Sequence, residues 1–192
     1  MAQYFDVHIH LQDERFGDNW LTHWNDANRN SVSGALCCGS EPCDWPKVRE
    51  IAATVRGIVP AYGVHPWYIH RIGNNWLDDL EMRLQAGGCG LGEVGLDGRF
   101  AKTPMLRQMD VLEAQLRLAD RFRLPVSLHT LDAWDQMIEI LQAFHGLRFN
   151  LHAFSAPERI DRLAHLGAFF SFNGGLSRKG NTRMKKALCA CP

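Results

Sequence analysis

The sequence lacks any excess of charge. Its 192 residues include 21 basic and 21 acidic side chains. This balance excludes a molecule-wide attraction to nucleic acid, so binding of a polyanion has to depend on a local basic patch or on bound metal. The best local patch is residues 178–186, with five basic side chains, although a solvated helix face is the simpler explanation.

Long apolar runs and regular cysteine spacings are also missing. No segment reaches the roughly 18 apolar residues of a membrane span, and Met1–Asp6 has no basic region followed by an apolar run. The six cysteines, at positions 37, 38, 43, 89, 189 and 191, show no C-x-x-C spacing and predict no disulfide framework. We therefore expect no membrane association and a location in the reducing cytoplasm.

Short apolar runs alternate with helical patterns along the whole chain. We expect strands near 4–9, 33–38, 58–63, 89–94, 125–129, 148–152 and 168–172, and helices near 18–29, 44–56, 75–86, 104–122, 132–145, 156–166 and 181–189. This alternation is typical of βα units around a parallel sheet. The pattern predicts an α/β fold of the TIM type, a (β/α) barrel with about seven of eight βα units, in one domain over residues 1–192.

The clearest helical pattern covers residues 104–122. Thr103 is expected to be its N-cap and Pro104 suits the first turn. Four residues mark its apolar face: Met109, Leu112, Leu116 and Ala119.

Four histidines and a glutamate stand at the predicted strand ends: His8, His10, Glu93, His129 and His152. The carboxyl ends of parallel strands meet at one face of a barrel, and residues two apart on a strand share a side, as His8 and His10 do. A buried, unpaired Glu93 would be costly, and a metal ion would supply its partner. The residues therefore predict a site for Zn²⁺, Mn²⁺ or another divalent first-row ion rather than Ca²⁺.

The strand-end motifs follow one another in a fixed order. D-x-H-x-H lies in Phe5–Leu11, G-x-H-P-W in Tyr62–Trp67 and G-E-V-G-L-D in Gly92–Asp97. The motifs at the ends of the fifth, sixth and seventh predicted strands are Pro125–His129, Leu151–Ser155 and Phe170–Gly174. Over all 192 residues, these motifs resemble the TatD family of metal-dependent deoxyribonucleases, within the amidohydrolase-like TIM barrels.

The resemblance implies hydrolysis of phosphodiesters in DNA, at nucleic-acid ends, with two divalent metal ions (Mg²⁺, Mn²⁺ or Zn²⁺) as cofactors. By this resemblance, His8 and His10 hold the first ion. Glu93 bridges to the second ion, and His129 and His152 complete that second site. No organic cofactor is expected.

The resemblance also implies that Glu93 and His65 are the catalytic residues. His65 is expected to contact the substrate phosphate or a metal ligand, and Asp97 to act through a ligand or structurally. The family's eighth strand carries an E-T-D segment whose aspartate binds the first metal and takes a proton from water, and no such segment precedes Pro192. We therefore expect a domain lacking the eighth strand and its helix, weak occupancy of the first metal site and impaired activity.

Two other functions fit the same residues. One is a small-molecule hydrolase of the amidohydrolase-like group, because this fold supports many reactions. The other is an inactive, truncated fragment that binds metal weakly. A barrel of seven strands would also leave open apolar edges near 4–9 and 168–172, and such edges predict self-association by strand pairing.

Overall fold

The computed structural model describes residues 3–192 and contains one parallel sheet of seven strands in the order β1 to β7. Each strand pairs in parallel with the next strand along the chain. The strands are β1 (Tyr4–Ile9), β2 (Val32–Cys38), β3 (Ile58–Tyr62), β4 (Gly90–Asp97), β5 (Val126–Leu131), β6 (Phe149–Leu151) and β7 (Ala168–Phe170). This order confirms the predicted barrel with seven βα units.

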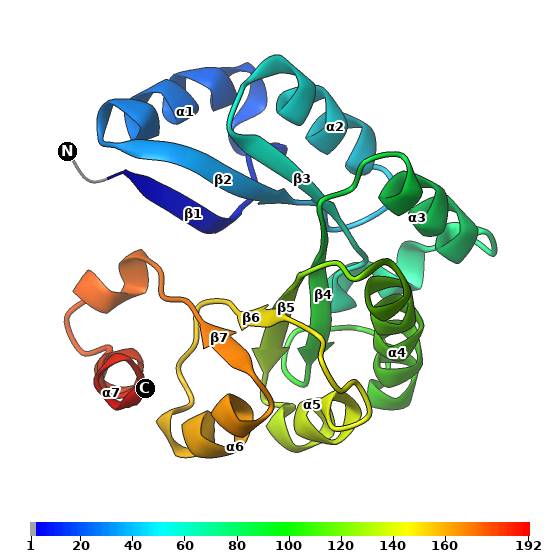
Figure 1. Cartoon of the computed structure of the whole chain (residues 1–192), viewed down its shortest axis with the longest axis vertical. Helices are drawn as coiled ribbons and strands as arrows, with labels where there is room; N and C mark the ends of the chain where they lie inside the picture. The colour runs from blue at the N-terminus through cyan, green and yellow to red at the C-terminus, as the bar shows by residue number, and fades with distance from the viewer. Residues whose placement is uncertain (1–2) are drawn as a thin grey trace.

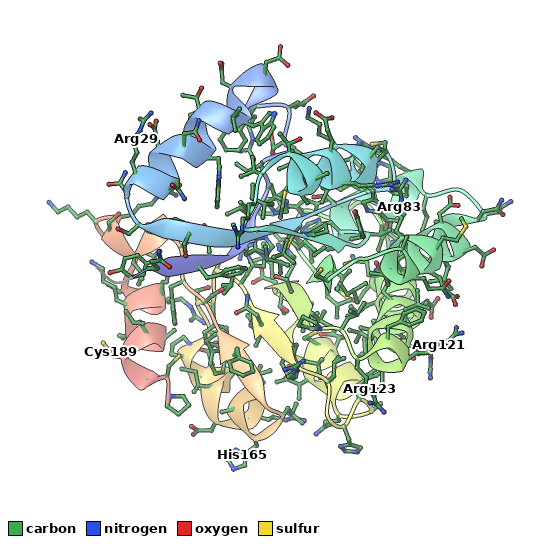
Figure 2. All side chains as sticks on the ribbon, turned by 45° about the horizontal axis from the view of Figure 1, so that its top comes forward. Arg29, Arg83, Arg121, Arg123, His165 and Cys189 are labelled. Atoms are coloured by element: carbon green, nitrogen blue, oxygen red, sulfur yellow. The ribbon has the colours of Figure 1, made fainter. Side chains whose placement is uncertain are left out.

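A helix follows each strand and lies on the outside of the curled sheet (Figure 1). The helices are α1 (Trp20–Arg29), α2 (Trp45–Thr54), α3 (Trp76–Gln85), α4 (Met105–Phe122), α5 (Trp134–Leu141), α6 (Ile160–His165) and α7 (Thr182–Ala190). Short 3₁₀ turns lie at η1 (Gly17–Asn19), η2 (Pro66–Arg71), η3 (Pro157–Arg159) and η4 (Gly174–Ser177). Charged side chains such as Arg29, Arg121 and Arg123 point outward from this helical layer (Figure 2).

The sheet curls so that β1 and β7 face each other across an open seam (Figure 1). Within residues 3–192, β1 pairs only with β2, and β7 pairs only with β6. A hollow of about 630 Å³ lies along this seam, lined by residues of β1 together with His152 and Asn173. The interior at the carboxyl ends of the strands therefore opens to solvent through the seam.

The hydrophobic core lies between the sheet and its helices and extends from Leu11 to Ala187 as one cluster. Every residue of β4 is buried, because helices cover the outside of the sheet and the other strands enclose its inside. Trp45 of α2 is fully buried, and its indole N–H donates to the backbone oxygen of Gly63 at 3.0 Å. No helix within residues 3–192 is long and apolar enough to cross a membrane.

Several predicted boundaries differ from the structure; β5, for example, continues past His129 to Leu131, so His129 lies inside its strand. The strand carrying Glu93 continues to Asp97, where it still pairs with Leu131 of β5, so Glu93 lies inside the strand and not at its end. Thr103 does not cap α4, because Pro104 takes the N-cap position and excludes the preceding residue from the helix. The hydroxyl of Thr103 is buried and has no hydrogen-bond partner among residues 3–192.

Candidate metal centre

The side chain of Glu93 lies at the centre of a cluster of five imidazoles. Glu93 is 4% exposed and projects from the middle of β4. The surrounding rings come from four other parts of the sheet: His8 and His10 from β1 and its end, His65 from the loop after β3, His129 from β5 and His152 from the end of β6. The structure thus brings together all six residues that the sequence singles out.

The two carboxylate oxygens of Glu93 face different histidines. Oε2 lies 3.3 Å from Nε2 of His8 and 2.9 Å from Nε2 of His10. Oε1 lies 2.6 Å from Nε2 of His152, 3.1 Å from Nδ1 of His129 and 3.2 Å from Nε2 of His65. The carboxylate therefore joins two groups of nitrogen donors.

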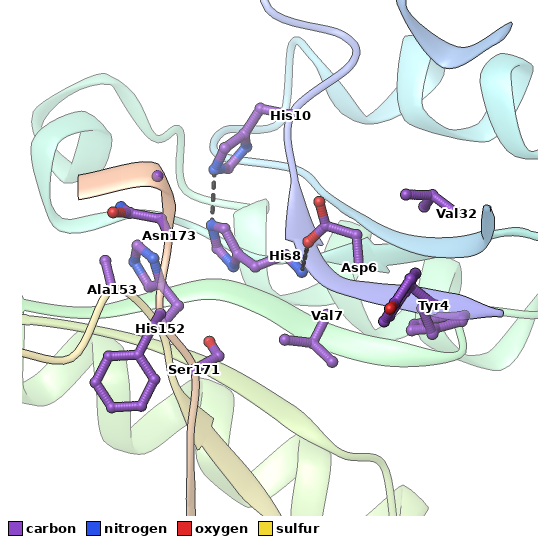
Figure 3. Close-up of a pocket in the computed structure, with 13 residues that line it drawn as sticks. Tyr4, Asp6, Val7, His8, His10, Val32, His152, Ala153, Ser171 and Asn173 are labelled. Carbon is purple, nitrogen blue, oxygen red and sulfur yellow. Dashed lines mark hydrogen bonds between the residues drawn. The ribbon is translucent and has the colours of Figure 1, made fainter. Parts of the chain in front are cut away.

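His8 and His10 are directed at Glu93 by contacts on the far side of each ring. Nδ1 of His10 donates to the backbone oxygen of Cys38 at 2.7 Å, which leaves a lone pair on Nε2. Nδ1 of His8 lies 2.7 Å from the hydroxyl of Ser127. The two Nε2 atoms are 2.9 Å apart, and the ring of His8 stacks on that of His152 with centroids 3.9 Å apart (Figure 3).

At His10, hydrogen-bond acceptor atoms lie next to one another. The Nε2 lone pair of His10 faces a carboxylate oxygen of Glu93 and the Nε2 of His8, all within 3.3 Å. Such an arrangement needs a positive charge between the atoms, either a ring proton or a metal ion. Nitrogen and carboxylate oxygen together suit a divalent first-row ion, so the donors present fit the expected metal.

His129 is held between two carboxylates. Its Nε2 donates to Oδ2 of Asp97 at 3.0 Å, which directs Nδ1 at Glu93. Burial lowers the pKa of His129, but the hydrogen bonds to Asp97 and Glu93 outweigh burial and raise it to about 9. Without a metal the ring is therefore protonated at neutral pH, and a metal ion at Nδ1 would replace that proton.

Glu93 and His8 show opposite effects of burial. Burial raises the pKa of Glu93, but attraction to the imidazoles, led by His152 and His65, lowers it to well below its usual range. Burial lowers the pKa of His8 to about 4 in spite of its contact with Glu93. The centre thus keeps an ionised carboxylate beside a neutral imidazole at neutral pH.

The role of His65 is set by the backbone N–H of Trp67. That N–H donates to Nδ1 of His65 at 3.1 Å, so the neutral ring carries its proton on Nε2. His65, Glu93 and His129 are close enough to share an ion. A protonated Nε2 nevertheless cannot bind a metal, and it suits donation of a hydrogen bond.

Asp97 contacts His129 and the loop after β4 and has no contact with Glu93 among the residues described. Besides the bond to His129, its Oδ2 accepts from the indole N–H of Trp67 at 2.6 Å. Its Oδ1 accepts from the backbone N–H of Arg99 at 2.8 Å and of Phe100 at 2.7 Å. Asp97 therefore fixes the ring of His129 and the loop after β4 together.

Two glutamines of α4, which the sequence does not single out, bind the backbone next to residues of the centre. The amide of Gln115 binds both the N–H and the C=O of Val64, at 2.7 and 3.2 Å. The amide of Gln108 binds the N–H and the C=O of Asp97, at 2.8 and 3.1 Å. Their spacing of seven residues, two helical turns, is the one signal in the sequence that these two polar residues share a buried face.

Gly95 has a steric reason to be glycine. Its φ is +153°, and a Cβ there would lie 1.9 Å from the backbone oxygen of His129. The strands β4 and β5 could not approach this closely with any side chain at this position. Gly95 therefore helps to keep Glu93 and His129 within contact distance.

The remaining histidines lie outside the cluster. His165 lies at the periphery and its Nδ1 contacts the backbone oxygen of Asp161 in α6 (Figure 2). His23 contacts Phe16 through its ring, and His70 is exposed in η2. The patch at residues 178–186 falls partly on α7, where Arg183 forms an ion pair with Glu158 at 2.6 Å.

A parallel (β/α) barrel with histidines and a carboxylate gathered at the carboxyl-terminal half of its strands belongs to the class of metal-dependent hydrolase barrels. A family model described as TatD related DNase matches residues 5–192. The chain therefore belongs to the TatD related DNase family, and the predicted resemblance is confirmed.

Three relatives illustrate this similarity. The metal-dependent hydrolase YjjV of Escherichia coli is 25% identical to this chain, over all of this chain and 76% of its own length. Its crystal structure matches with a TM-score of 0.81, over 87% of this chain and 66% of the YjjV chain. The 3'-5' ssDNA/RNA exonuclease TatD of Yersinia pseudotuberculosis is 30% identical over 71% of this chain and 54% of its own length. Human deoxyribonuclease TATDN3 is 29% identical over 91% of this chain and 69% of its own length.

Proposed function

We propose that this protein is a metal-dependent phosphodiester hydrolase that acts on DNA, at the ends of single strands. The observation that carries the proposal is the set of nitrogen donors that converge on the buried, ionised carboxylate of Glu93. Relatives described as a 3'-5' ssDNA/RNA exonuclease and a deoxyribonuclease support a nucleic-acid substrate.

We propose that two divalent ions (Mg²⁺, Mn²⁺ or Zn²⁺) bind on either side of Glu93. His8 and His10 would hold the first ion, and His129 and His152 the second, with Glu93 contributing one oxygen to each. Bound ions of this kind polarise a phosphate and lower the pKa of water to about 7, which supplies a nucleophile. The orientation of His10 by Cys38 and of His129 by Asp97 supports this assignment.

The catalytic residues in this proposal are Glu93 and His65. Glu93 holds the ligand set together, because its oxygens contact all five histidines. His65 would donate its Nε2 proton in a hydrogen bond to a phosphate oxygen of the substrate, since the N–H of Trp67 occupies Nδ1. The pair thus combines charge with a fixed hydrogen-bond donor.

The proposal predicts metal-dependent release of nucleotides from single-stranded DNA. The dialysed, chelator-treated protein should be inactive, and added Mn²⁺ or Mg²⁺ should restore hydrolysis, because a metal-generated nucleophile is required. The assay follows product length on a gel, with a lactone and a small phosphate ester tested in parallel. Turnover of those small esters but not of DNA would instead make the protein a small-molecule hydrolase.

We also propose that the free edge of β1 pairs with a second copy of this chain. The edge is apolar, with Tyr4, Phe5 and Val7 at 61%, 52% and 41% exposed, and it has no proline to discourage pairing. Sedimentation should show self-association that increases with concentration, and Val7→Lys should shift it toward monomer. Leu21→Lys on α1, at a residue 40% exposed, is the matched control and should sediment as the wild type does.

We further propose that residues 1–192 act as one hydrolase domain and that the protein works in the cytoplasm. The single hydrophobic core from β1 to α7 supports the first proposal. All six cysteines are unpaired and two of them, Cys37 and Cys38, are buried, which suits a reducing compartment.

A further inference from the structure

A second hollow, of about 360 Å³, lies beside the metal centre. It is lined by Trp67, His70, Arg71, Phe100 and Lys102. Trp67 is 41% exposed and Phe100 is 62% exposed, although both are large apolar rings. Their centroids are 6.2 Å apart and their planes meet at 86°, so the two rings form a corner that is open to solvent.

This corner is fixed to the metal centre through Asp97. Oδ2 of Asp97 accepts from the indole N–H of Trp67 and from Nε2 of His129. Oδ1 of the same carboxylate accepts from the backbone N–H of Phe100. The ring of Trp67 also lies edge-on to His129, with centroids 6.2 Å apart. One carboxylate therefore holds both aromatic residues and a histidine of the centre in place.

The charged side chains around the corner are basic. Arg71 and Lys102 line the hollow, and no acidic side chain lines it among the residues described. Arg71 is held in place by an ion pair with Glu41 at 2.9 Å and by its position over the ring of Tyr68. Lys102 forms no ion pair within residues 3–192. The unpaired charge of Lys102 attracts phosphates, whereas the ion pair with Glu41 offsets part of the charge of Arg71.

We propose that this hollow binds a nucleobase of single-stranded nucleic acid next to the phosphodiester at the metal centre. The base would stack on Phe100 with its edge against Trp67, and the flanking phosphates would lie near Arg71 and Lys102. Exposed aromatic rings with basic neighbours are how proteins bind single strands without reading sequence, because every base has a π-face. The inference rests on the proposed nuclease function, and it names the contact that selects an unpaired strand.

Phe100 offers the cleanest test, because only its backbone contacts Asp97 and a variant keeps that bond. The probes are a fluorescein-labelled phosphorothioate oligothymidylate and an abasic strand of the same length, both measured by anisotropy with Mg²⁺ present. Phe100→Ala should raise the Kd for oligothymidylate about 5- to 100-fold, and by a smaller factor for the abasic strand. Phe100→Trp should restore binding.

Two further variants separate stacking from charge and from general surface effects. Phe169→Ala removes an aromatic ring with a similar exposure, 63%, outside the hollow, and should bind both probes as the wild type does. Lys102→Ala should weaken binding of both probes by the same factor. It should also reduce the slope of log Kd against log salt concentration by about one, because one phosphate contact is lost.

The outcomes distinguish the two proposals. If the wild type hydrolyses single-stranded DNA but Phe100→Ala weakens both probes equally or neither, the nuclease function stands and the base-stacking site is wrong. If the wild type neither binds nor hydrolyses single-stranded DNA, both proposals fail. A loss confined largely to the base-carrying probe, with rescue by Phe100→Trp, supports the stacking site.

Discussion

Replacing Glu93 with glutamine should remove metal binding and hydrolysis together. The substitution keeps the shape of the side chain but replaces the negative charge with an amide, whose NH₂ group cannot bind a metal. The carboxylate contacts all five histidines of the cluster. We expect metal affinity to fall by more than the roughly 10- to 100-fold that is typical when a residue behind a ligand is lost, because Glu93 contacts both sites directly.

Metal content after dialysis, isothermal titration and the single-strand assay measure this effect. Glu113→Gln is the matched control, because Glu113 is a partly exposed glutamate of α4 whose one ion pair within residues 3–192 is with Arg117, and its loss should change neither metal content nor hydrolysis. Circular dichroism shows whether the variant remains folded. A folded Glu93→Gln protein that retains metal and turnover at the wild-type level would contradict both the ligand assignment and the catalytic role of Glu93.

The sequence could predict the members of the cluster but not their roles. His8 and His10 are two residues apart on a strand, and the periodicity of a strand alone places them on one side. The protonation of His65 and of His129 depends on contacts from other elements, the N–H of Trp67 and the carboxylate of Asp97. No spacing in the sequence reveals which nitrogen of an imidazole meets which partner.

The length of β4 could not be predicted for a related reason. The apolar pattern of this strand is complete by residue 94, but pairing with β5 continues to Asp97. Partners on a neighbouring strand, not local propensity, decide where a central strand ends. Because of this extension, Asp97 lies within hydrogen-bond distance of His129, and its carboxylate also binds the backbone N–H of Phe100.

The sequence also could not predict the contacts by which the glutamines of α4 stabilise the fold. Gln115 is 1% exposed, and both of its hydrogen bonds are made to Val64, the residue before His65. A helical pattern can show that Gln115 faces the core, but it cannot name a partner that lies 51 residues away. A buried backbone N–H and C=O that lose their only partner cost about 1–3 kcal/mol each.

Gln115→Met should therefore lower the free energy of unfolding by about 2–6 kcal/mol, less a partial gain from the apolar side chain. This is a large share of the about 5–15 kcal/mol that holds a typical domain folded. Urea denaturation measures it, and Gln85→Met is the control, because Gln85 is exposed on α3 and bonds only to Glu81 of the same helix. Hydrolysis should also fall under conditions where the Gln115→Met protein is folded, since the freed loop no longer holds His65 against Glu93. Equal unfolding curves for the two variants would show that the Val64 loop keeps its position without Gln115.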